Sequence, residues 1–471
     1  MESTNKKVLK AGGWYVVCTF LTKGIYLITT PIFTRILSKN DYGVTTTYNS
    51  WLSLLTVICT LDLYSCIQLA KVEFEENSRK FLSSIMFLSS LAVGGFYIIY
   101  KILAYFSLFS LGMPDILVDI LFIDILFRNA YTLYQTFHRV YLKYKEFTFL
   151  TILTTIMGQA LAVILVYVGK SQAYVGRIVG TAIPMTIVGA IILIGTILKE
   201  KVSFNRQYWS MGLKVSVPLI PHHLSAFILT NSDRIIISAY IGAAATAVYG
   251  IASDYALVVS TLWSAINQAW VPLFYEKMKE NVLKEIYDFT EIYTVLFAMI
   301  VILATAFGPE AIWILGGSSY EEACTVIPPI LMGIMFQFLY SLYVNIEFYY
   351  KKTAGIAIWT VLAAVVNIIL NILFIPYFGY VAAGYTTMIG YALMFMLHRR
   401  IAGKIDKRTI YNEPFLLWTI IGTAACIWLM YLLYNYLLLR ILLVAVMTGF
   451  FGYRYRHMVV GFFKEKSIKK P

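Results

Sequence analysis

Charged residues are scarce in this sequence. Only 13% of the 471 residues are Asp, Glu, Lys or Arg, whereas a soluble domain carries about 25%. Hydrophobic residues make up 59% of the chain, and the mean hydropathy is +0.73. A chain of this length with so little charge lacks the polar surface that soluble domains need. The composition therefore indicates a polytopic membrane protein with little soluble mass.

Cysteine and long polar loops are also scarce. The five cysteines form no Cys-x-x-Cys pair, and no cysteine or paired carboxylate stands at metal-ligand spacing. The sequence thus predicts no disulfide framework, no metal site and no cofactor. The longest segment expected on the outer side runs from Gly308 to Ala323. Because this segment is too short to fold into a catalytic domain, we expect that the protein is not an enzyme.

Long apolar runs make up most of the chain. A helix needs about 20 apolar residues to cross a bilayer. The predicted fold is therefore an all-α membrane protein with about fourteen transmembrane helices. The expected spans lie near residues 11–32, 44–69, 81–107, 116–137, 148–169, 175–198, 209–231, 247–273, 289–308, 325–350, 354–375, 379–397, 414–433 and 436–453.

The basic residues indicate in which direction the spans run. Of the 38 lysines and arginines, 28 fall on the side that holds both termini, six fall on the other side, and four lie inside spans. Loops rich in lysine and arginine stay in the cytoplasm, so both termini are predicted to be cytoplasmic. This distribution accounts for most of the net charge of +13, and nucleic acid is therefore not an expected partner.

A short pattern occurs once in each half of the chain. After the first span comes TRILSKNDYG, with Arg35 and the pair Tyr42-Gly43. After the seventh comes DRIIISAYIGAAATAVYG, with Arg234 and the pair Tyr249-Gly250. In each half an arginine is expected to close one helix and Tyr-Gly to open the next. The offset of six spans predicts two pseudo-symmetric six-helix lobes related by an axis along the membrane normal, followed by two extra helices.

Three segments carry a resemblance to a known family. They are PIFTRILSKNDYG after the first span, YVGRIVGTAIP in the sixth, and SVPLIPHHLSAFILTNSDRIIISAYIGAAATAVYGIA in the seventh and eighth. Over nearly its whole length the chain resembles the polysaccharide branch of the multidrug/oligosaccharidyl-lipid/polysaccharide exporter superfamily, the Wzx-type O-antigen and capsule flippases. The resemblance implies a V-shaped pair of lobes that opens alternately to each side of the membrane. We expect residues 1–206 and 207–400 to form the lobes, and residues 401–471 to form two extra spans and a basic tail.

The resemblance also implies a function. Such flippases move oligosaccharides linked to undecaprenyl pyrophosphate across the bacterial plasma membrane, and basic residues in their cleft are thought to meet the pyrophosphate or acidic sugars. We therefore expect a monomeric flippase for O-antigen, capsule or related lipopolysaccharide synthesis. The polysaccharide polymerase and chain-length proteins are candidate partners.

Five basic residues are the candidate ligands for that anion. They are Lys23, Arg35, Arg128, Lys214 and Arg234. A charge near the bilayer centre costs about 2.5–3.5 kcal/mol on insertion scales. Such residues persist where they face water, a partner or a substrate. Lys23, near the middle of the first span, lies too deep to reach the interface easily and is the strongest candidate.

Simpler roles remain open for the other four basic residues. Arg128 lies four residues after Asp124, so the two side chains can pair on one helix. Lys214 can extend to the membrane edge. Arg35 and Arg234 can anchor helix ends at the interface.

Acidic residues in the spans are candidates for proton or sodium coupling. They are Asp62 in the second span, Asp233 at the end of the seventh, and Asp254 in the eighth. Each can instead serve as a counter-ion, and for Asp62 that partner is Lys23. His222 is a further candidate for proton coupling, with polar packing as the alternative.

The seventh span contains two helix-disrupting residues. Pro218 and Pro221 each lack a backbone donor, and they predict a bend in this span. Bent helices at a substrate cavity are common in transporters. We expect the seventh span to line the cleft.

Two other functions are weighed against the flippase. An organic-cation antiporter of the same fold would need acidic groups in the cleft, and the sequence offers more bases than acids at depth. A polysaccharide polymerase would need large outer loops, and only Asp115 and Asp119 form an acidic pair near an outer helix end.

The predicted topology can be tested with reporter fusions. Green fluorescent protein after Pro471 should fluoresce, because this terminus is expected in the cytoplasm. Alkaline phosphatase fused after Gly112, in the expected second outer loop, should be active. Phosphatase activity at the C-terminus would contradict the predicted orientation.

Overall fold

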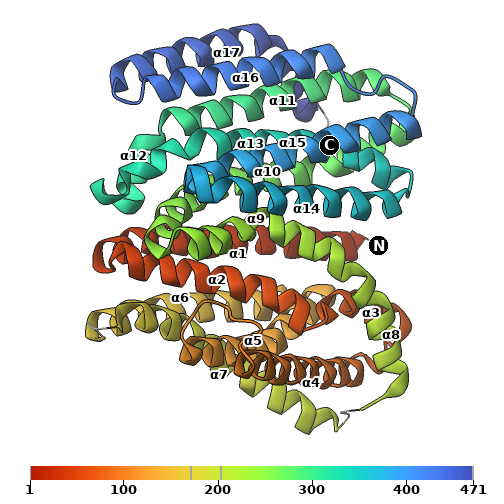
Figure 1. The fold of residues 1–471 in the computed structure, drawn as a ribbon. Coiled ribbons are helices and arrows are strands. Elements are labelled where there is room, and N and C mark those ends of the chain that lie inside the picture. The colour runs from red at the N-terminus through yellow and green to blue at the C-terminus, as the bar shows by residue number, and fades with distance from the viewer. Residues whose placement is uncertain (1, 170–171, 202–203, 469–471) are drawn as a thin grey trace. The chain divides into compact units, whose positions relative to one another are not determined.

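The chain folds entirely into helices where its structure is described (Figure 1). The structure is a computed structural model that describes residues 2–169, 172–201 and 204–468, and no strand occurs within those ranges. It divides into two compact units. The first comprises Met1–Gly250, Leu315–Gly317 and Thr360–Ala383, and the second comprises Ile251–Ile314, Ser318–Trp359 and Gly384–Pro471.

The first unit holds the N-terminal helices. In chain order these are α1 (Glu2–Ile36), α2 (Lys39–Cys59), η1 (Leu63–Cys66), α3 (Ile67–Glu73), α4 (Ser78–Tyr105), α5 (Asp115–Val140), α6 (Tyr144–Val168), α7 (Ala173–Glu200), α8 (Arg206–Ser216), η3 (Val217–Leu219) and α9 (Ile220–Tyr240). The start of α10 (Ala243–Glu280) and most of α14 (Thr353–Phe378) also belong to it.

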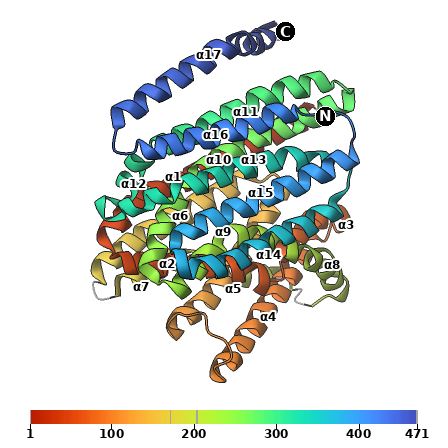
Figure 2. The same ribbon diagram turned by 45° about the horizontal axis from the view of Figure 1, so that its top comes forward.

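The second unit holds most of the C-terminal helices. These are the rest of α10, α11 (Leu283–Ala306), α12 (Gly308–Gly316), η4 (Ser318–Thr325), α13 (Ile327–Tyr349), α15 (Tyr380–Ile405), α16 (Glu413–Leu432) and α17 (Leu437–Ile468). Helices α11 and α16 run side by side, and α17 lies along the outer edge of this unit (Figure 2).

Each of the fourteen predicted spans lies on a helix or on a pair of helices with a break. Within the described residues, twelve helices are long and apolar enough to cross a membrane, and a bent pair brings the number to thirteen. The predicted fourth span is the remaining one: α5 has 26 residues but contains Asp119, Asp124 and Arg128. The all-α membrane fold is confirmed, while the lobe boundaries at residues 206 and 400 stay a prediction.

The second span is broken, which its sequence did not indicate. Helix α2 ends at Cys59, and the chain continues through η1 and α3 with a bend of 55°. Leu61 and Asp62 occupy the left-handed region, with φ of 54° and 52°, a conformation that non-glycine residues adopt rarely. No proline or glycine stands at this break.

The seventh span is interrupted where its prolines predicted a bend. The one-turn 3-10 helix η3, which contains Pro218, separates α8 from α9, and Pro221 stands in the first turn of α9. The prediction that Arg234 closes this helix was wrong, however. Helix α9 continues to Tyr240, so Asp233 and Arg234 lie within it.

The two Tyr-Gly pairs lie at a close crossing of α2 and α10 in the first unit. A Cβ atom on Gly43 would lie 1.7 Å from the carbonyl oxygen of Ala243, and one on Gly250 would lie 3.1 Å from Cγ2 of Thr46. The backbones approach this closely only because Gly43 lacks a side chain, while Gly250 leaves room for the side chain of Thr46. The recurring glycines therefore have a packing role.

The expected outer loop between α11 and α13 is largely helical and is fixed to α17. Arg440 is 2% exposed. It donates to Glu310 of α12 at 2.6 and 2.9 Å and to the backbone oxygens of Ala306 and Tyr434. These hydrogen bonds lower the pKa of the Glu310 carboxyl. Arg440 thus holds the last two helices against α11 and α12.

The crossing of α2 and α10 predicts a strong effect of one added methyl group. Gly43→Ala should destabilise the protein by about 1–3 kcal/mol or more, because neither backbone can yield easily. Thermal unfolding of the purified protein in detergent measures the effect. Gly24→Ala is the matched control, since nothing lies within 4 Å of a Cβ atom there. Equal stability of the two variants would contradict the close crossing.

Candidate functional site

The two interrupted spans meet at a carboxylate and an imidazole in the first unit. The Oδ2 atom of Asp62, at the break after α2, lies 2.8 Å from Nδ1 of His223 on α9. Asp62 is fully buried, whereas the His223 side chain is 28% exposed. A buried carboxylate needs a partner, and it finds one on the span that contains the 3-10 turn at Pro218. The two discontinuities are thus linked by one polar contact.

The hydrogen bonds around this contact reach only one of the two oxygens of the Asp62 carboxylate. Ser65 donates to Oδ2 of Asp62 at 2.7 Å. The ring of Tyr64 stacks on His223 with centroids 5.8 Å apart, and its hydroxyl lies 3.4 Å from Nδ1. The Oδ1 atom of Asp62 is buried and has no hydrogen-bond partner among the described residues. This oxygen can accept a further proton, water or ion.

The structure brings the candidate Asp62 together with His223, which was not among the candidates, and not with Lys23 or His222. His223 contacts Asp62, while Nδ1 of His222 is buried without a hydrogen-bond partner within the described residues. The break after α2 rotates the chain so that Asp62 faces α9, and nothing in the sequence announces that break. The signal that the sequence did offer was the pair of prolines, Pro218 and Pro221, shortly before His223.

Arg128 and Asp124 form the pair that their spacing allowed. Nε and Nη2 of Arg128 donate to the two carboxylate oxygens of Asp124 at 3.1 and 2.9 Å. Asp124 is buried and Arg128 is partly buried. This bidentate geometry satisfies the acid on its own helix. A role for Arg128 in substrate binding stays a prediction.

Asp233 lies in a second buried polar cluster of the first unit. Its carboxylate accepts hydrogen bonds from the Tyr249 hydroxyl and, at 2.5 Å, from the Asn371 amide on α14. Asn371 also donates to Asn367 at 3.3 Å. All four side chains are buried. Tyr249, from the second Tyr-Gly pair, thus contacts Asp233, one of the acids considered for proton or sodium coupling.

The other candidates are distributed along several helices. Lys23 of α1, Arg234 of α9 and Asp254 of α10 are partly buried, whereas Arg35 and Lys214 are exposed. The guanidinium of Arg35 donates to the backbone oxygen of Pro31 at 2.9 Å, which places it as a cap at the end of α1. The exposed position of Lys214 in α8 fits the alternative in which this side chain extends to the membrane edge.

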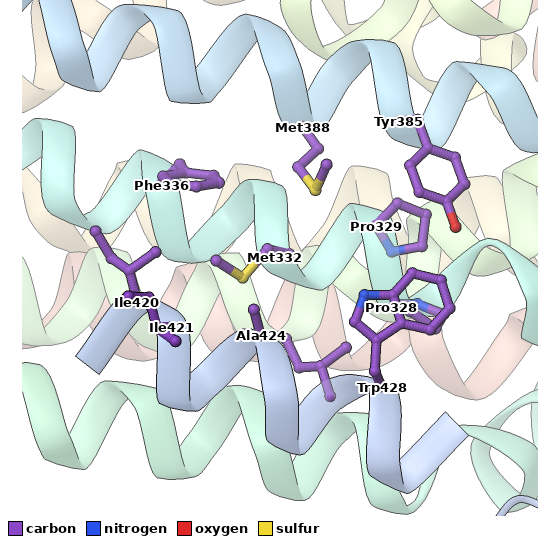
Figure 3. Close-up of a pocket in the computed structure, with 11 residues that line it drawn as sticks. Pro328, Pro329, Met332, Phe336, Tyr385, Met388, Ile420, Ile421, Ala424 and Trp428 are labelled. Carbon is purple, nitrogen blue, oxygen red and sulfur yellow. The ribbon is translucent and has the colours of Figure 1, made fainter. Parts of the chain in front are cut away.

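An apolar pocket of about 360 Å³ lies in the second unit (Figure 3). Three helices line it: α13 through Met332 and Phe336, α15 through Tyr385 and Met388, and α16 through residues that include Trp428. No charged side chain lines the pocket, and none of the predicted site residues does. The pocket suits a hydrocarbon group and offers nothing to a pyrophosphate.

Comparison with protein families decides the relationship. A family model described as polysaccharide biosynthesis protein matches residues 8–278, more than half of the chain. The chain belongs to this family. Lsg locus protein 1 of Haemophilus influenzae is 23% identical over 403 residues, which cover 80% of this chain and 95% of that protein. A membrane protein of Methanocaldococcus jannaschii is 23% identical over 91% of this chain and 90% of its own length.

Solved structures show the same fold. The lipid II flippase MurJ, in an inward closed conformation, matches 94% of this chain and 99% of its own with a TM-score of 0.73 and 16% identity. An inward-facing multidrug resistance transporter of the MATE family and MOP superfamily matches 82% and 96% with a TM-score of 0.57 and 14% identity. The predicted exporter fold is therefore confirmed for this member of the polysaccharide biosynthesis family.

The contact between the interrupted spans leads to a stability prediction. Asp62→Asn should destabilise the protein by about 1–3 kcal/mol, because it removes a buried charged acceptor from His223 and Ser65. Denaturant unfolding in detergent gives the value. Asp119→Asn is the control, because the 2.6 Å pair of Asp119 with Lys101 is more than one-third exposed on both sides and should contribute less. A larger loss in the control would refute the importance of the buried contact.

Proposed function

We propose that this protein moves oligosaccharide units linked to undecaprenyl pyrophosphate from the cytoplasmic to the outer leaflet of the bacterial plasma membrane. The proposal is supported chiefly by one observation: two interrupted spans meet at Asp62 and His223 in a chain of the polysaccharide biosynthesis family. Discontinuous helices at the substrate site are a recurring element of transporters that alternate between two openings. O-antigen and capsule are the product classes proposed, and the product is used by a polymerase with its chain-length protein.

Basic residues of the first seven spans supply the proposed anion site. Lys23, Arg35, Arg128, Lys214 and Arg234 are distributed over α1, α5, α8 and α9, all within the first unit. In this proposal Lys23 contacts the pyrophosphate. Arg128 pairs with Asp124 when no substrate is bound, and it binds the substrate when the pyrophosphate competes with Asp124 for its guanidinium. The lipid tail stays in the bilayer, so the protein solvates only the polar head.

The membrane potential is the proposed driving force. An inside-negative potential favours outward movement of an anion by about 2.3 kcal/mol per charge per 100 mV. The same field draws an empty cationic site inward. Coupling to protons or sodium ions through Asp62, Asp233, Asp254 or His222 is the alternative. The buried cluster around Asp233 supports it, since buried carboxylates in spans commonly bind coupling ions.

A second candidate function is export of an organic cation. The MATE transporter with a TM-score of 0.57 supports it as a fold relationship. The buried acids Asp62 and Asp233 offer it negative charge. The flippase is favoured because the family match names polysaccharide biosynthesis. A role as polymerase lacks support, because the expected outer loop with Glu310 is occupied by α12 and η4 and by the contact with Arg440.

Flipping in liposomes tests the proposal. The substrate is a fluorescent oligosaccharide on undecaprenyl pyrophosphate, and its protection from an external reagent is followed under an imposed potential. Lys23→Ala should slow flipping about tenfold or more, because it removes a charged contact to the pyrophosphate. Lys199→Ala, at an exposed helix end, should leave the rate unchanged. Lys23→Arg should restore part of the activity.

Three outcomes would contradict the proposal in different ways. Flipping that is unchanged when only the potential is collapsed would exclude the potential as the driving force. Equal rates for Lys23→Ala and Lys199→Ala would exclude Lys23 as a ligand. Uptake of a cationic dye without flipping of any glycan lipid would assign the protein to the second candidate function.

A further inference from the structure

A second carboxylate and imidazole pair lies buried in the second unit. Glu347 near the end of α13 and His398 near the end of α15 are both 0% exposed. The Oε1 atom of Glu347 lies 2.5 Å from Nδ1 of His398. A nitrogen and an oxygen approach this closely only with a hydrogen between them. In this structure Nδ1 or Oε1 therefore carries a proton.

The pair leaves two polar atoms without partners. Oε2 of Glu347 and Nε2 of His398 are buried, and neither has a hydrogen-bond partner among the described residues. The ring of Tyr340 covers His398 edge-on, with centroids 4.7 Å apart. A buried polar atom without a partner costs about 1–3 kcal/mol. Two such atoms in one contact between α13 and α15 call for an explanation.

The protonation states of the pair supply that explanation. With the bridging hydrogen alone, the pair is a carboxylate and a neutral imidazole with net charge −1. One added proton, on Nε2 or on Oε2, makes the pair neutral. Those two positions are the two atoms without partners. Because an uncompensated charge is costly in a buried site, the burial of this pair favours the form with the added proton.

The charged groups around the pair already have partners of their own. Arg399 of α15 pairs with Glu413 of α16, which also accepts from Tyr343 of α13. Hydrogen bonds from Arg408 lower the pKa of Asp406 to about 2, and Tyr350 donates to the same acid. Asn412 donates to Glu291 of α11. None of these interactions compensates a charge on the Glu347 and His398 pair.

We propose that Glu347 and His398 form a proton-binding site that takes up one proton. Both residues stand near helix ends that are followed by basic loops, with Lys351 and Lys352 after α13 and Arg399 and Arg400 within the end of α15. Such ends are predicted to be cytoplasmic. The proton therefore comes from a cytoplasmic hydronium ion, which leaves one water molecule and converts the pair from net charge −1 to neutral.

Nuclear magnetic resonance of the full-length protein in nanodiscs tests this site without any lipid substrate, so the result does not depend on the proposed function. The protein is labelled with 13C and 15N at its five histidines, and the His398 signal is assigned by its loss in His398→Gln. In the wild type, this signal should shift reversibly as one proton binds. In Glu347→Gln, the shift should be lost, because the proposed site no longer holds its carboxylate.

Glu413→Gln is the matched control, since it removes a carboxylate from the neighbouring pair with Arg399 and should leave the His398 titration unchanged. A wild-type His398 signal that stays constant over the range in which the protein remains folded would overturn the proposal. Equal titration in the wild type and Glu347→Gln would also overturn it. If Glu347→Gln does not fold, Glu347→Asp, which withdraws the carboxylate, is measured in its place.

Replacing sodium chloride with choline chloride distinguishes a proton site from a site for a metal cation. The proposal expects the same His398 titration in both salts. Weaker proton binding in sodium chloride would show that sodium competes for the carboxylate, and it would overturn the assignment of the proton as the ligand.

Discussion

Every polar group of a membrane-spanning helix must find a partner inside the protein, because hydrocarbon offers none. The buried acids of this chain show how that constraint is met. Asp124 is bound by an arginine one turn away, Asp233 by Tyr249 and Asn371, and Asp62 by His223. Each partner except Arg128 comes from a different helix. The acids therefore fix which helices lie together, and apolar packing fills the space between them.

The same constraint separates structural from functional pairs. Arg440 and Glu310 form two short hydrogen bonds, and further backbone acceptors bind the arginine. Asp406 is satisfied by Arg408 and Tyr350. The pairs of Asp62 with His223 and of Glu347 with His398 each keep an oxygen without a partner. An incompletely satisfied acid beside an imidazole can change its protonation state, whereas an acid clamped by a guanidinium keeps its charge.

Much of the fold could be predicted from the sequence, because apolar runs and basic loops are dictated by the bilayer itself. The interruption at Pro218 and Pro221 was also visible, since proline has a known local effect. The break at Leu61 and Asp62 was not visible, because both residues adopt a left-handed backbone with no glycine or proline beside them. The contacts of His223, Glu347 and His398 depend on helix rotations that no single span encodes. For that reason the sequence indicated which charges were unusual but not which pairs they form.

The contact between Arg440 and Glu310 has a consequence for biosynthesis. Glu310 emerges from the ribosome well before Arg440, because it comes earlier in the chain. In the interval, the carboxylate on α12 lacks the guanidinium of Arg440. The short helices between α11 and α13 gain this contact only when α17 has been inserted and delivers its arginine. Maturation of this part of the second unit thus waits for a helix that is synthesised well after it. A chain that ends before α17 would present the membrane quality-control machinery with an open segment in its middle, far from the truncation itself.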